Sequence, residues 1–381
     1  PLTIEQVPTS ISGPPSIGLG KGTQLQLPLA LLDADGTPIP GATFHYTSSD
    51  AATVTVSSTG LLTSVGPLGS ATITVTSGTI TKKITVSVVT VTHPLGNIVS
   101  TASIGGSNYG AAISKAGVVY VVQLGSGLVR ADLPSFTFGT PFSISGAWSV
   151  AFAPGGATAY VAGYNNSGLA IVDVASNTVT GTVTAGTAGN AFDVAASQDG
   201  SRVFMSGDGH VYVIDPVAKS IVFNVTVPGA ANHISVHPSQ PFVYASLFNA
   251  QEVDEVNVQT GVLTQRFNVA GTPQGTVVSP YGTYLYIANE SGTLDILNLS
   301  TKTIEASVPL GCGGFGIAMT PDAQQLWVSC GYGNVVKVVD IASRAVVATI
   351  AAGNSPRRVA FDAGGTTAVV VGDGGTAVFV Q

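Results

Sequence analysis

Short runs of apolar residues, separated by Gly, Asp, Asn, Ser and Thr, recur along the whole chain. The segment 169–178 is typical, because Leu-Ala-Ile-Val-Asp-Val is followed at once by Ala-Ser-Asn-Thr. Such runs are too short for most helices and are rich in the β-branched residues that strands favour. The pattern of apolar and polar positions therefore predicts an all-β protein.

Two features of this pattern repeat. The first is an Asp or Asn that ends an apolar run, in steps of 41 or 42 residues: Asp132, Asp173, Asp215, Asn257, Asn298 and Asp340. The second is a large or branched residue inside another apolar run, at nearly the same spacing: Tyr120, Tyr160, Phe204, Tyr244, Tyr286, Trp327 and Val369. Self-similarity near this period, carried by short strands, is typical of a β-propeller whose blades are four-stranded sheets.

The repeats predict seven blades, at 105–145, 146–186, 187–229, 230–271, 272–311, 312–353, and 354–381 combined with 97–104. The last blade needs this combination because its third strand ends at Gln381, whereas 97–104 resembles the outer strand at 345–350. We expect 97–104 to pair with the last blade as its outermost strand, which would protect an open sheet edge. The second predicted domain is thus 97–381.

Residues 1–92 do not share this period and form the first predicted domain. Alternating runs at 23–27, 43–46, 52–56, 71–75 and 83–88 are separated by turn-forming clusters. About seven short strands in a segment of this length predict an antiparallel β-sandwich of the immunoglobulin type. A short linker at 93–96 follows.

Several segments of this first domain resemble the bacterial Ig-like group 2 (BIG2) domain. They are Tyr-Thr-Ser-Ser-Asp at 46–50, Thr-Gly-Leu-Leu-Thr at 59–63 and Gly-Ser-Ala-Thr-Ile-Thr-Val at 69–75. Tyr46 stands where that family usually has Trp, which keeps a large aromatic side chain for the core. The resemblance implies a spacer or adhesion module of a surface protein rather than a catalyst.

The repeats resemble the YVTN family of propellers, which is related in shape to surface-layer and lactonase-like propellers. The second, fifth, sixth and seventh blades best show the pattern Gly…Pro…Val-Ala-Phe-x-Pro-Asp-Gly…Tyr-Val-Ala…Ile-Asp. The third strands lack the Trp-Asp ending of WD repeats. The resemblance implies a seven-bladed propeller that follows the Ig-like sandwich.

The composition limits the classes of partner and the cellular locations that we expect for the protein. Charged residues make up only 9% of the chain, the net charge is −7, and the 13 Lys and Arg form no basic run, which argues against a nucleic-acid partner. No apolar run reaches the roughly 20 residues of a membrane span. Low charge with abundant Gly, Ser and Thr favours an exported bacterial protein, extracellular, on the cell surface or periplasmic. We expect a monomer.

The repeats also predict a candidate ligand-binding site, formed by residues at equivalent positions in the first strand of each blade. The first strand of a propeller blade lies nearest the axis, so residues at equal positions in these strands should form one ring at the channel mouth. The ring would contain Tyr109, Trp148, Phe192, Asn232, Gln274, Phe315 and Arg357. Apolar surface with a few polar groups is typical of a small-molecule pocket, whereas the same aromatic side chains could simply plug the channel. In a pocket, Arg357 would favour an anionic or carbonyl-bearing ligand, and Trp148 and Phe315 would offer flat faces.

His233 adds a polar group at the same mouth. His237, four residues further along an extended strand, would lie about 13 Å away, too far to share a metal ion. We therefore expect no metal site and no cofactor. The loops between second and third strands carry Asp208, Glu290 and Asp373. Solvated loop charge is the default interpretation of each, and the alternative is an ion-paired rim in which they face Arg357 and Arg358 across the mouth.

Two cysteines, Cys312 and Cys330, belong to the same repeat. In an exported protein they are expected to form a disulfide across the hairpin of the first two strands. The sequence leaves two functions open. One is a binding protein, an Ig-like stalk that presents a propeller to a surface glycan, a protein or a small molecule. The other is a propeller hydrolase or lyase, for which no catalytic residues can be assigned from the sequence.

Overall fold

The computed structural model describes residues 7–13, 16–22, 24–27, 29–89, 93–94, 96–163, 168–185, 189–353 and 355–381. Several predictions fall on residues outside this description. They are the start of the predicted run at Thr23, the domain boundary and linker at 90–92 and 95, and the predicted blade limits at 186–187 and 354; residues 1–6 are outside it as well. The described chain is almost entirely strand, and its helices are the short 3-10 turns η1 (Phe248–Ala250) and η2 (Gly331–Gly333). The predicted all-β class is confirmed.

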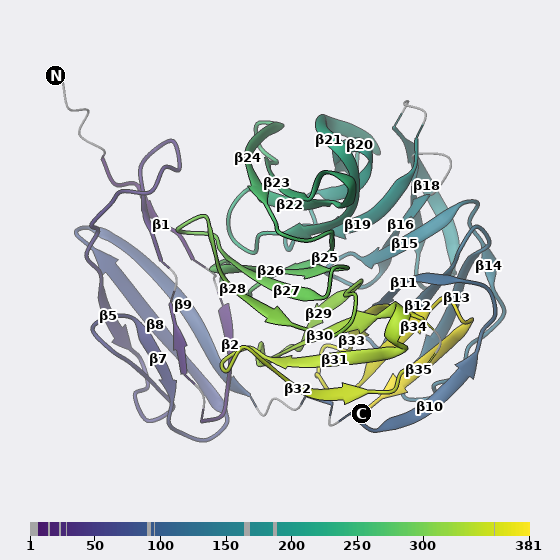
Figure 1. The fold of residues 1–381 in the computed structure, drawn as a ribbon. Helices are drawn as coiled ribbons and strands as arrows, with labels where there is room; N and C mark the ends of the chain where they lie inside the picture. The colour runs from purple at the N-terminus through teal and green to yellow at the C-terminus, as the bar shows by residue number, and fades with distance from the viewer. Residues whose placement is uncertain are drawn as a thin grey trace. The chain divides into compact units, whose positions relative to one another are not determined.

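The chain forms two compact units (Figure 1). The first unit contains residues 1–92 together with the short segments 238–240 and 280–283, and the second contains the rest of the chain from His93. Each unit has its own buried core, because the residues that pack around Leu62, Ile73 and Ile84 belong to the first unit.

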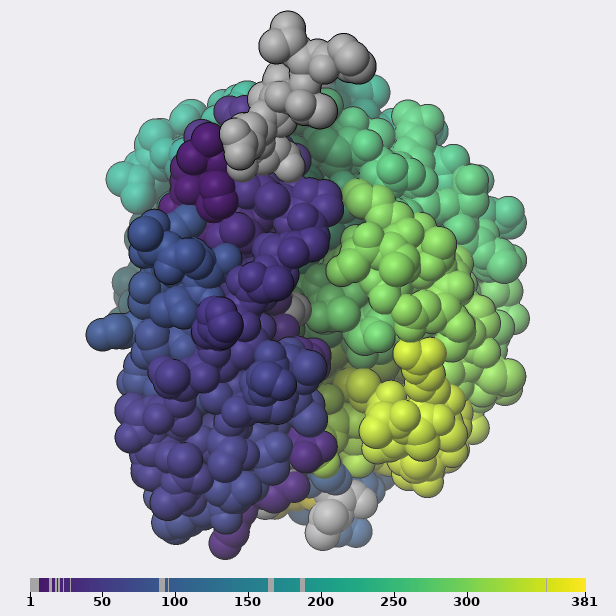
Figure 2. Space-filling model, turned by 90° about the vertical axis from the view of Figure 1, so that its left-hand side faces the viewer, coloured from purple at the N-terminus to yellow at the C-terminus, as the bar shows by residue number. Residues whose placement is uncertain are grey.

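The first unit contains three small sheets, and Figure 2 shows one face of this unit in purple and blue. Two strands pair in the smallest sheet, β1 (Ser10–Ile11) and β4 (Leu31–Leu32). Three strands form the next, in the order β3 (Gln24–Gln26), β7 (Leu61–Ser64), β6 (Val54–Val56). Four form the largest, in the order β2 (Ser16–Gly20), β9 (Ile80–Val89), β8 (Gly69–Ser77), β5 (His45–Ser48).

The expected all-antiparallel pairing is wrong at one place in this unit, because β2 and β9 run parallel, from Ser16 opposite Thr85 to Gly20 opposite Val89. Antiparallel strands can be joined by a tight hairpin, but six other strands of the unit lie between β2 and β9 in the sequence, so this pair is free of that constraint. Tyr46 is half-buried at the edge of the core, and its ring fills the space beside Gly60, where a Cβ would lie 2.8 Å from the tyrosine oxygen.

The second unit is a succession of sheets in chain order, whose strands are as follows. The first sheet has β11 (Asn108–Ile113), β12 (Val118–Gln123), β13 (Gly127–Asp132) and β14 (Phe142–Ser143). The next has β15 (Ala147–Phe152), β16 (Thr158–Gly163), β17 (Gly168–Asp173) and β18 (Thr178–Thr184). A six-stranded sheet follows, with β19 (Ala191–Ala196), β20 (Val203–Asp215), β21 (Ser220–Val236), β22 (Phe242–Leu247), β23 (Glu252–Asn257) and β24 (Val262–Asn268).

Three further four-stranded sheets complete the unit. The first contains β25 (Pro273–Val278), β26 (Tyr284–Asn289), β27 (Thr293–Asn298) and β28 (Thr303–Pro309). The second contains β29 (Ile317–Met319), β30 (Gln325–Cys330), β31 (Val335–Asp340) and β32 (Ala345–Ile350). The last contains β33 (Pro356–Phe361), β34 (Ala368–Gly372), β35 (Thr376–Val380) and β10 (Ile98–Ser103). No sheet of the described residues closes on itself.

The six-stranded sheet differs from the predicted boundary between the repeats 187–229 and 230–271. Strand β21 continues through both, pairing with β20 as far as Ala230 and with β22 from Ala231. Pro228 and Gly229 stay extended within it, so the connection between two repeats is a strand rather than a loop.

The strand nearest the start of the second unit pairs with the strand nearest its end (Figure 1). Ile98 lies opposite Val380 and Ser103 opposite Thr376, and Asn97 and Gln381 exchange both backbone hydrogen bonds at 2.9 and 2.8 Å. This is the position that the sequence pattern predicts for 97–104. The pairing covers the edge of β35 that would otherwise be open.

The first strands of successive sheets pack beside one another, and the contacts run from β11 through β15, β19, β21, β25, β29 and β33 back to β11. The cores lie between neighbouring sheets. One such core joins Tyr120 and Val122 of one sheet to Val150 and Val161 of the next. The recurring large residues predicted inside the second strands are all buried, with Tyr120 and Val369 fully inaccessible. Burying such side chains stabilises a fold by roughly 1.5–3 kcal/mol each.

The recurring Asp and Asn residues close turns, because their short side chains can accept hydrogen bonds from nearby backbone N–H groups. In five of the six repeats the side-chain oxygen accepts backbone N–H groups two or three residues further on, for example Asn257 from Gln259 and Thr260 at 2.9 and 3.1 Å. Asp132 departs from the pattern because its carboxylate instead binds the guanidinium of Arg130 at 2.8 Å. These residues shape the turn to the fourth strand, which is a structural role.

Candidate ligand-binding site

One cavity of about 220 Å³ opens among the first strands of the second unit. Its lining contains every residue that the sequence predicts for the ring, together with the predicted His233: Tyr109, Trp148, Phe192, Asn232, His233, Gln274, Phe315 and Arg357, with Gly275, Gly316 and Arg358. The structure therefore brings all eight predicted ligand-binding residues to one place. Whether the cavity binds a ligand stays a prediction.

The arrangement follows from the repeat, because the ring residues occupy equivalent positions in successive first strands. Tyr109, Trp148, Phe192, Gln274 and Arg357 are each the second residue of a first strand, and each is half-buried. Both neighbours are buried in the first four of these strands, whereas Arg358 beside Arg357 is itself half-buried. In each of these strands the pairing with the second strand shifts register at this position, so equivalent residues present their side chains alike and the next residue can line the same cavity. Phe315 lies just before the shorter strand β29, where backbone bonds to Ser329 keep it in register.

Aromatic rings form an arc along one side of the cavity. The ring centroids of Tyr109 and Trp148 are 4.7 Å apart, and those of Trp148 and Phe192 are 5.8 Å apart in an edge-on arrangement. Burial, with the neighbouring Asp373 carboxylate, raises the pKa of Tyr109, so its phenol stays neutral. Such pairs stabilise one another by about 0.5–1.5 kcal/mol beyond the area they bury.

Arg357 continues the arc. Its guanidinium lies 4.0 Å from the centroid of the Phe315 ring and 5.5 Å from that of Tyr109, which is cation–π geometry. It also pairs with Asp373, from Nη2 to Oδ2 at 2.7 Å and from Nε to the same oxygen at 2.8 Å. The charge of Arg357 is thus compensated by a carboxylate before any ligand binds.

Amide groups face the aromatic arc. Asn232 donates to the side-chain oxygen of Gln274 at 3.4 Å, and the Gln274 amide donates to the Glu290 carboxylate at 3.1 Å. The ring therefore has an apolar, π-rich side and a hydrogen-bonding side.

A second layer lies one residue further along each first strand. In chain order it contains Gly110, Ser149, Asp193, His233, Gly275, Gly316 and Arg358. The glycines permit the close approach of the adjacent strand, since a Cβ at Gly275 would lie 2.5 Å from the Phe315 carbonyl oxygen and one at Gly316 would lie 2.2 Å from that of Arg357. The remaining four positions are polar or charged.

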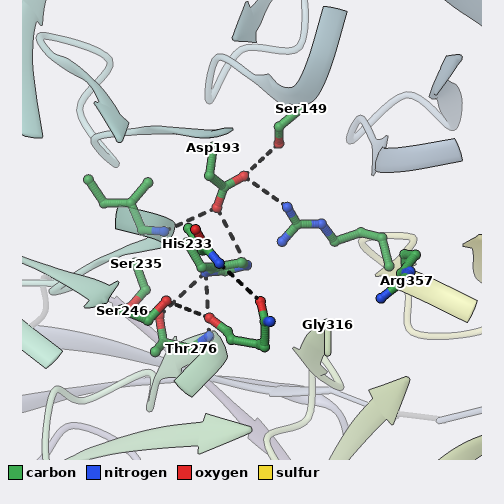
Figure 3. A network of polar contacts seen from close by, with 12 residues as sticks. Ser149, Asp193, His233, Ser235, Ser246, Thr276, Gly316 and Arg357 are labelled. Carbon is green, nitrogen blue, oxygen red and sulfur yellow. Dashed lines mark hydrogen bonds and ion pairs between the residues drawn. The ribbon is translucent and has the colours of Figure 1, made fainter. Parts of the chain in front are cut away.

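Asp193 is the centre of this layer (Figure 3). One carboxylate oxygen accepts from the Ser149 hydroxyl at 2.5 Å and from the Arg358 guanidinium at 3.0 Å. The other accepts from the backbone N–H of Ile234 at 3.1 Å and lies 3.4 Å from Nε2 of His233. Burial alone would raise the pKa of Asp193, but the Arg358 guanidinium and the hydrogen bonds from Ser149 and Ile234 hold it below its usual value, so the carboxylate is ionised.

His233 is neutral in this environment. Burial lowers its pKa to about 4, and Arg358 acts in the same direction, whereas Asp193 opposes the shift. The backbone N–H of Thr276 points to Nδ1 at 3.4 Å, which makes Nδ1 an acceptor and assigns the ring proton to Nε2, facing Asp193. Both nitrogens of His233 are thus engaged.

Arg358 reaches across the site. It comes from β33, whereas its partner Asp193 comes from β19, and in the succession of first strands β11 and β15 lie between these two. The side chains of Arg358 and Asp193 are only 15% and 6% exposed, so the pair is largely withdrawn from solvent. The pair crosses the site at the level of the second layer, below the ring formed by the first-strand residues.

The predicted ion-paired rim is only partly correct. Asp373 pairs with Arg357 as expected, but Glu290 accepts from Gln274, and Asp208 accepts from the Asn190 side chain at 2.8 Å. Arg358 pairs with Asp193 rather than with a loop carboxylate. Arg358 follows Arg357 at a register shift in the pairing of β33 with β34, and although both residues line the cavity, the guanidinium of Arg358 reaches Asp193 in the deeper layer.

The other sequence candidates lie elsewhere. His237 is buried in the turn from β21 to β22, where its backbone N–H donates to the Phe242 carbonyl at 2.9 Å. Cys312 and Cys330 are joined by a disulfide with a Cα–Cα distance of 5.8 Å. Among the described residues no group of three or more His, Cys, Asp and Glu side chains is arranged to hold a metal ion.

Sequence reasoning missed Asp193, Ser149 and Tyr332. Asp193 and Ser149 occupy the position in their repeats that His233 and Arg358 occupy in theirs, so the same periodicity one residue further along each first strand marks them. Tyr332 lies in η2, outside the repeated pattern, and no periodic signal marks it. Its ring is 73% exposed and meets the Phe315 ring edge-on with centroids 5.3 Å apart.

Comparisons with known proteins bear on the fold. Residues 16–88 match the profile of the bacterial Ig-like domain (group 2), so the first unit contains a BIG2 domain. No curated protein matches the chain. Among solved structures, a chain of Kuenenia stuttgartiensis hydrazine synthase is similar, with a TM-score of 0.66 and 14% identity, and the alignment covers 76% of this chain and 99% of that chain. At this identity the likeness shows a shared fold alone. Within the described part of the chain, no helix has the length and hydropathy needed to cross a membrane.

Proposed function

We propose that the protein is an exported bacterial binding protein, in which a BIG2 stalk carries a seven-bladed β-propeller of the YVTN type. The succession of sheets supports the propeller, because their first strands contact one another in a closed circuit. The pairing of β10 with β35 supports closure of the last blade by residues 97–104. The BIG2 domain and the disulfide favour an extracellular, cell-surface or periplasmic location.

The single observation that carries the binding function is the cavity itself. Aromatic, amide and guanidinium groups from the first strands of all seven proposed blades converge on one space of about 220 Å³. Rigid strands hold these groups, and convergent polar groups on an apolar wall are the usual composition of a small-molecule site.

A hydrolase or lyase is the second candidate, because Ser149, Asp193 and His233 lie together beneath the cavity. The order of their contacts argues against nucleophilic catalysis. In a catalytic triad the histidine accepts the serine proton, whereas here Ser149 donates directly to Asp193 and Nδ1 of His233 faces the Thr276 amide. We therefore favour binding.

Tryptophan fluorescence tests the binding function. The chain has two tryptophans, Trp148 in the cavity lining and Trp327, which is 1% exposed in a core between sheets. We expect at least one member of a panel of methyl glycosides, amino acids and dicarboxylates, each at millimolar concentration, to change the emission of the wild-type protein. The Trp148→Phe variant should show no such change. A panel without effect, or with equal effects on both proteins, would contradict binding in this cavity.

A further inference from the structure

The charges around the cavity are already paired, which limits the ligands that it can attract. Arg357 is neutralised by Asp373 at 2.7 Å and Arg358 by Asp193 at 3.0 Å, and Glu290 adds a carboxylate beside Gln274. An anionic ligand would compete with Asp373 for Arg357 and would meet Glu290. The expectation that Arg357 selects an anion is therefore not supported, and an uncharged ligand fits better.

The two faces of the ring describe a flat ligand with an apolar face and polar edges. Trp148 and its aromatic neighbours offer π faces to C–H groups, while Asn232 and Gln274 offer amide donors and acceptors on the opposite side. Arg357 uses Nε and Nη2 for Asp373, which leaves the N–H groups of Nη1 for neutral acceptors such as hydroxyl oxygens. A pyranose ring has this combination of a C–H face and hydroxyl edges.

The size of the cavity limits how much of the ligand enters. At about 220 Å³ it is smaller than the roughly 300–1,000 Å³ of pockets that enclose drug-sized ligands. It has room for about one sugar ring, and a longer ligand must extend outside.

Tyr332 is an exposed aromatic residue that adjoins the lining of the cavity. It is 73% exposed, contacts Phe315 of the lining, and has the Arg357 guanidinium 5.9 Å from its ring centroid. Its short helix η2 directly follows Cys330, so the disulfide to Cys312 braces the backbone from which Tyr332 projects. An exposed aromatic ring in such a position gains little from folding and can serve as a stacking platform.

We propose that the cavity binds one ring of an uncharged saccharide and that Tyr332 forms a second, external subsite for the adjoining ring. This inference rests on the proposed binding function of the cavity and adds the ligand class and a subsite that the repeated pattern does not reveal.

The test compares neutral monosaccharides with their linear tetrasaccharides, using the emission of Trp148. The probes are the methyl glycosides of glucose, galactose, mannose and N-acetylglucosamine, tetrasaccharides of the same sugars, and glucuronate as a charged counterpart of glucose. We expect a tetrasaccharide to bind the wild-type protein roughly 3- to 10-fold more tightly than its monosaccharide, the gain of one stacking contact. In Tyr332→Ala this difference should vanish while the monosaccharide affinity stays unchanged, and Tyr332→Phe should keep it.

Each other outcome overturns the proposal at a definite point. Tighter binding of glucuronate than of glucose would refute the argument from paired charges. Equal loss of monosaccharide and tetrasaccharide binding in Tyr332→Ala would refute an external subsite. Emission changes with amino acids or dicarboxylates but with no saccharide would refute the ligand class and leave the proposed binding function standing. No change with any probe would refute both.

Discussion

At the residue scale, equal positions in the repeat carry different chemistry. Asp254 in β23 and Asp295 in β27 occupy the same position of adjacent repeats, and both are buried. Asp295 accepts from Asn289 at 2.9 Å and from Ser307 at 2.5 Å. Asp254 has no hydrogen-bond donor among the described residues, and its nearest cation is Nε of Arg266 at 3.9 Å. The two repeats thus bury a carboxylate at the same position, but only that of Asp295 has hydrogen-bond donors among the described residues.

This contrast gives a pH-dependent prediction. Burial raises the pKa of Asp254 to about 6, Arg266 opposes the shift, and Glu252 adds to it. Since the unfolded carboxyl titrates near 3.9, the unfolded chain releases this proton first as pH rises, and the folded state loses stability between about pH 4 and 6. Asp254→Asn should therefore increase the unfolding free energy by about 1–2 kcal/mol at pH 8 and leave it nearly unchanged at pH 4.

Urea denaturation at both pH values measures the effect. The matched control is Asp295→Asn, which weakens the bond from Ser307 and should destabilise the protein by about 1 kcal/mol or more at pH 8. Equal effects of the two substitutions at pH 8 would contradict the distinction between a partnered and an unpartnered carboxylate.

The deep ion pair gives the second prediction at this scale. Asp193→Asn leaves the largely buried Arg358 without its counter-charge, and removing one partner of such a pair costs about 3–5 kcal/mol of unfolding free energy. Arg358→Gln should cost a similar amount, and the double variant should cost clearly less than the sum, because no unpaired charge remains. Additive losses in this double-mutant cycle would show that Asp193 and Arg358 are not coupled. Asp373→Asn, at the more exposed pair with Arg357, serves as a milder control.

Much of the site could be predicted at this scale, and the reason is geometric. Phase alone places Trp148, Phe192 and Arg357 at one level, because alternation and repetition are both visible in the sequence. The pairing of Arg358 with Asp193 could not be predicted, since it depends on a long side chain reaching a strand 165 residues away in the sequence. Tyr332 could not be predicted either, because it stands in a turn that breaks the repeat.

At the element scale, the pairing of β10 with β35 is the feature with the clearest consequence for stability. Deleting residues 1–90 retains β10, whereas deleting 1–105 removes it and exposes the edge of β35. We expect the protein without residues 1–90 to stay folded and monomeric. The protein without residues 1–105 should melt at a lower temperature and aggregate. Light scattering during a thermal melt measures both properties. If the two truncated proteins melt alike as monomers, β10 does not protect the edge of the last sheet.

Elements were predictable where turns separate them and unpredictable where none does. The runs at 71–75 and 83–88 became the longer strands β8 and β9, whose apolar alternation is plain. The parallel pairing of β9 with β2 could not be predicted from either sequence segment, because a strand has the same alternation of buried residues whether its neighbour runs parallel or antiparallel. Strand β21 continues through Pro228 and Gly229, residues that usually signal a turn, because its two halves pair with different neighbours.

At the scale of the whole molecule, the two units differ in how the sequence encodes them. The second repeats one strand pattern, so errors at single residues average out and the number of predicted blades follows from the period. The first has no internal repeat, and its prediction depended on alternating runs and on resemblance to BIG2 domains, which the match at 16–88 supports.

If the cavity binds a saccharide as proposed, the pair between Arg358 and Asp193 would also decide which part of a polymer it reaches. Because this largely buried pair crosses the site, we expect a linear polysaccharide to enter by a chain end rather than to pass through. Retention would then depend on the number of ends rather than on the mass of polymer. Brief hydrolysis of an insoluble neutral polysaccharide, which multiplies its ends, should increase the amount of protein that each gram retains.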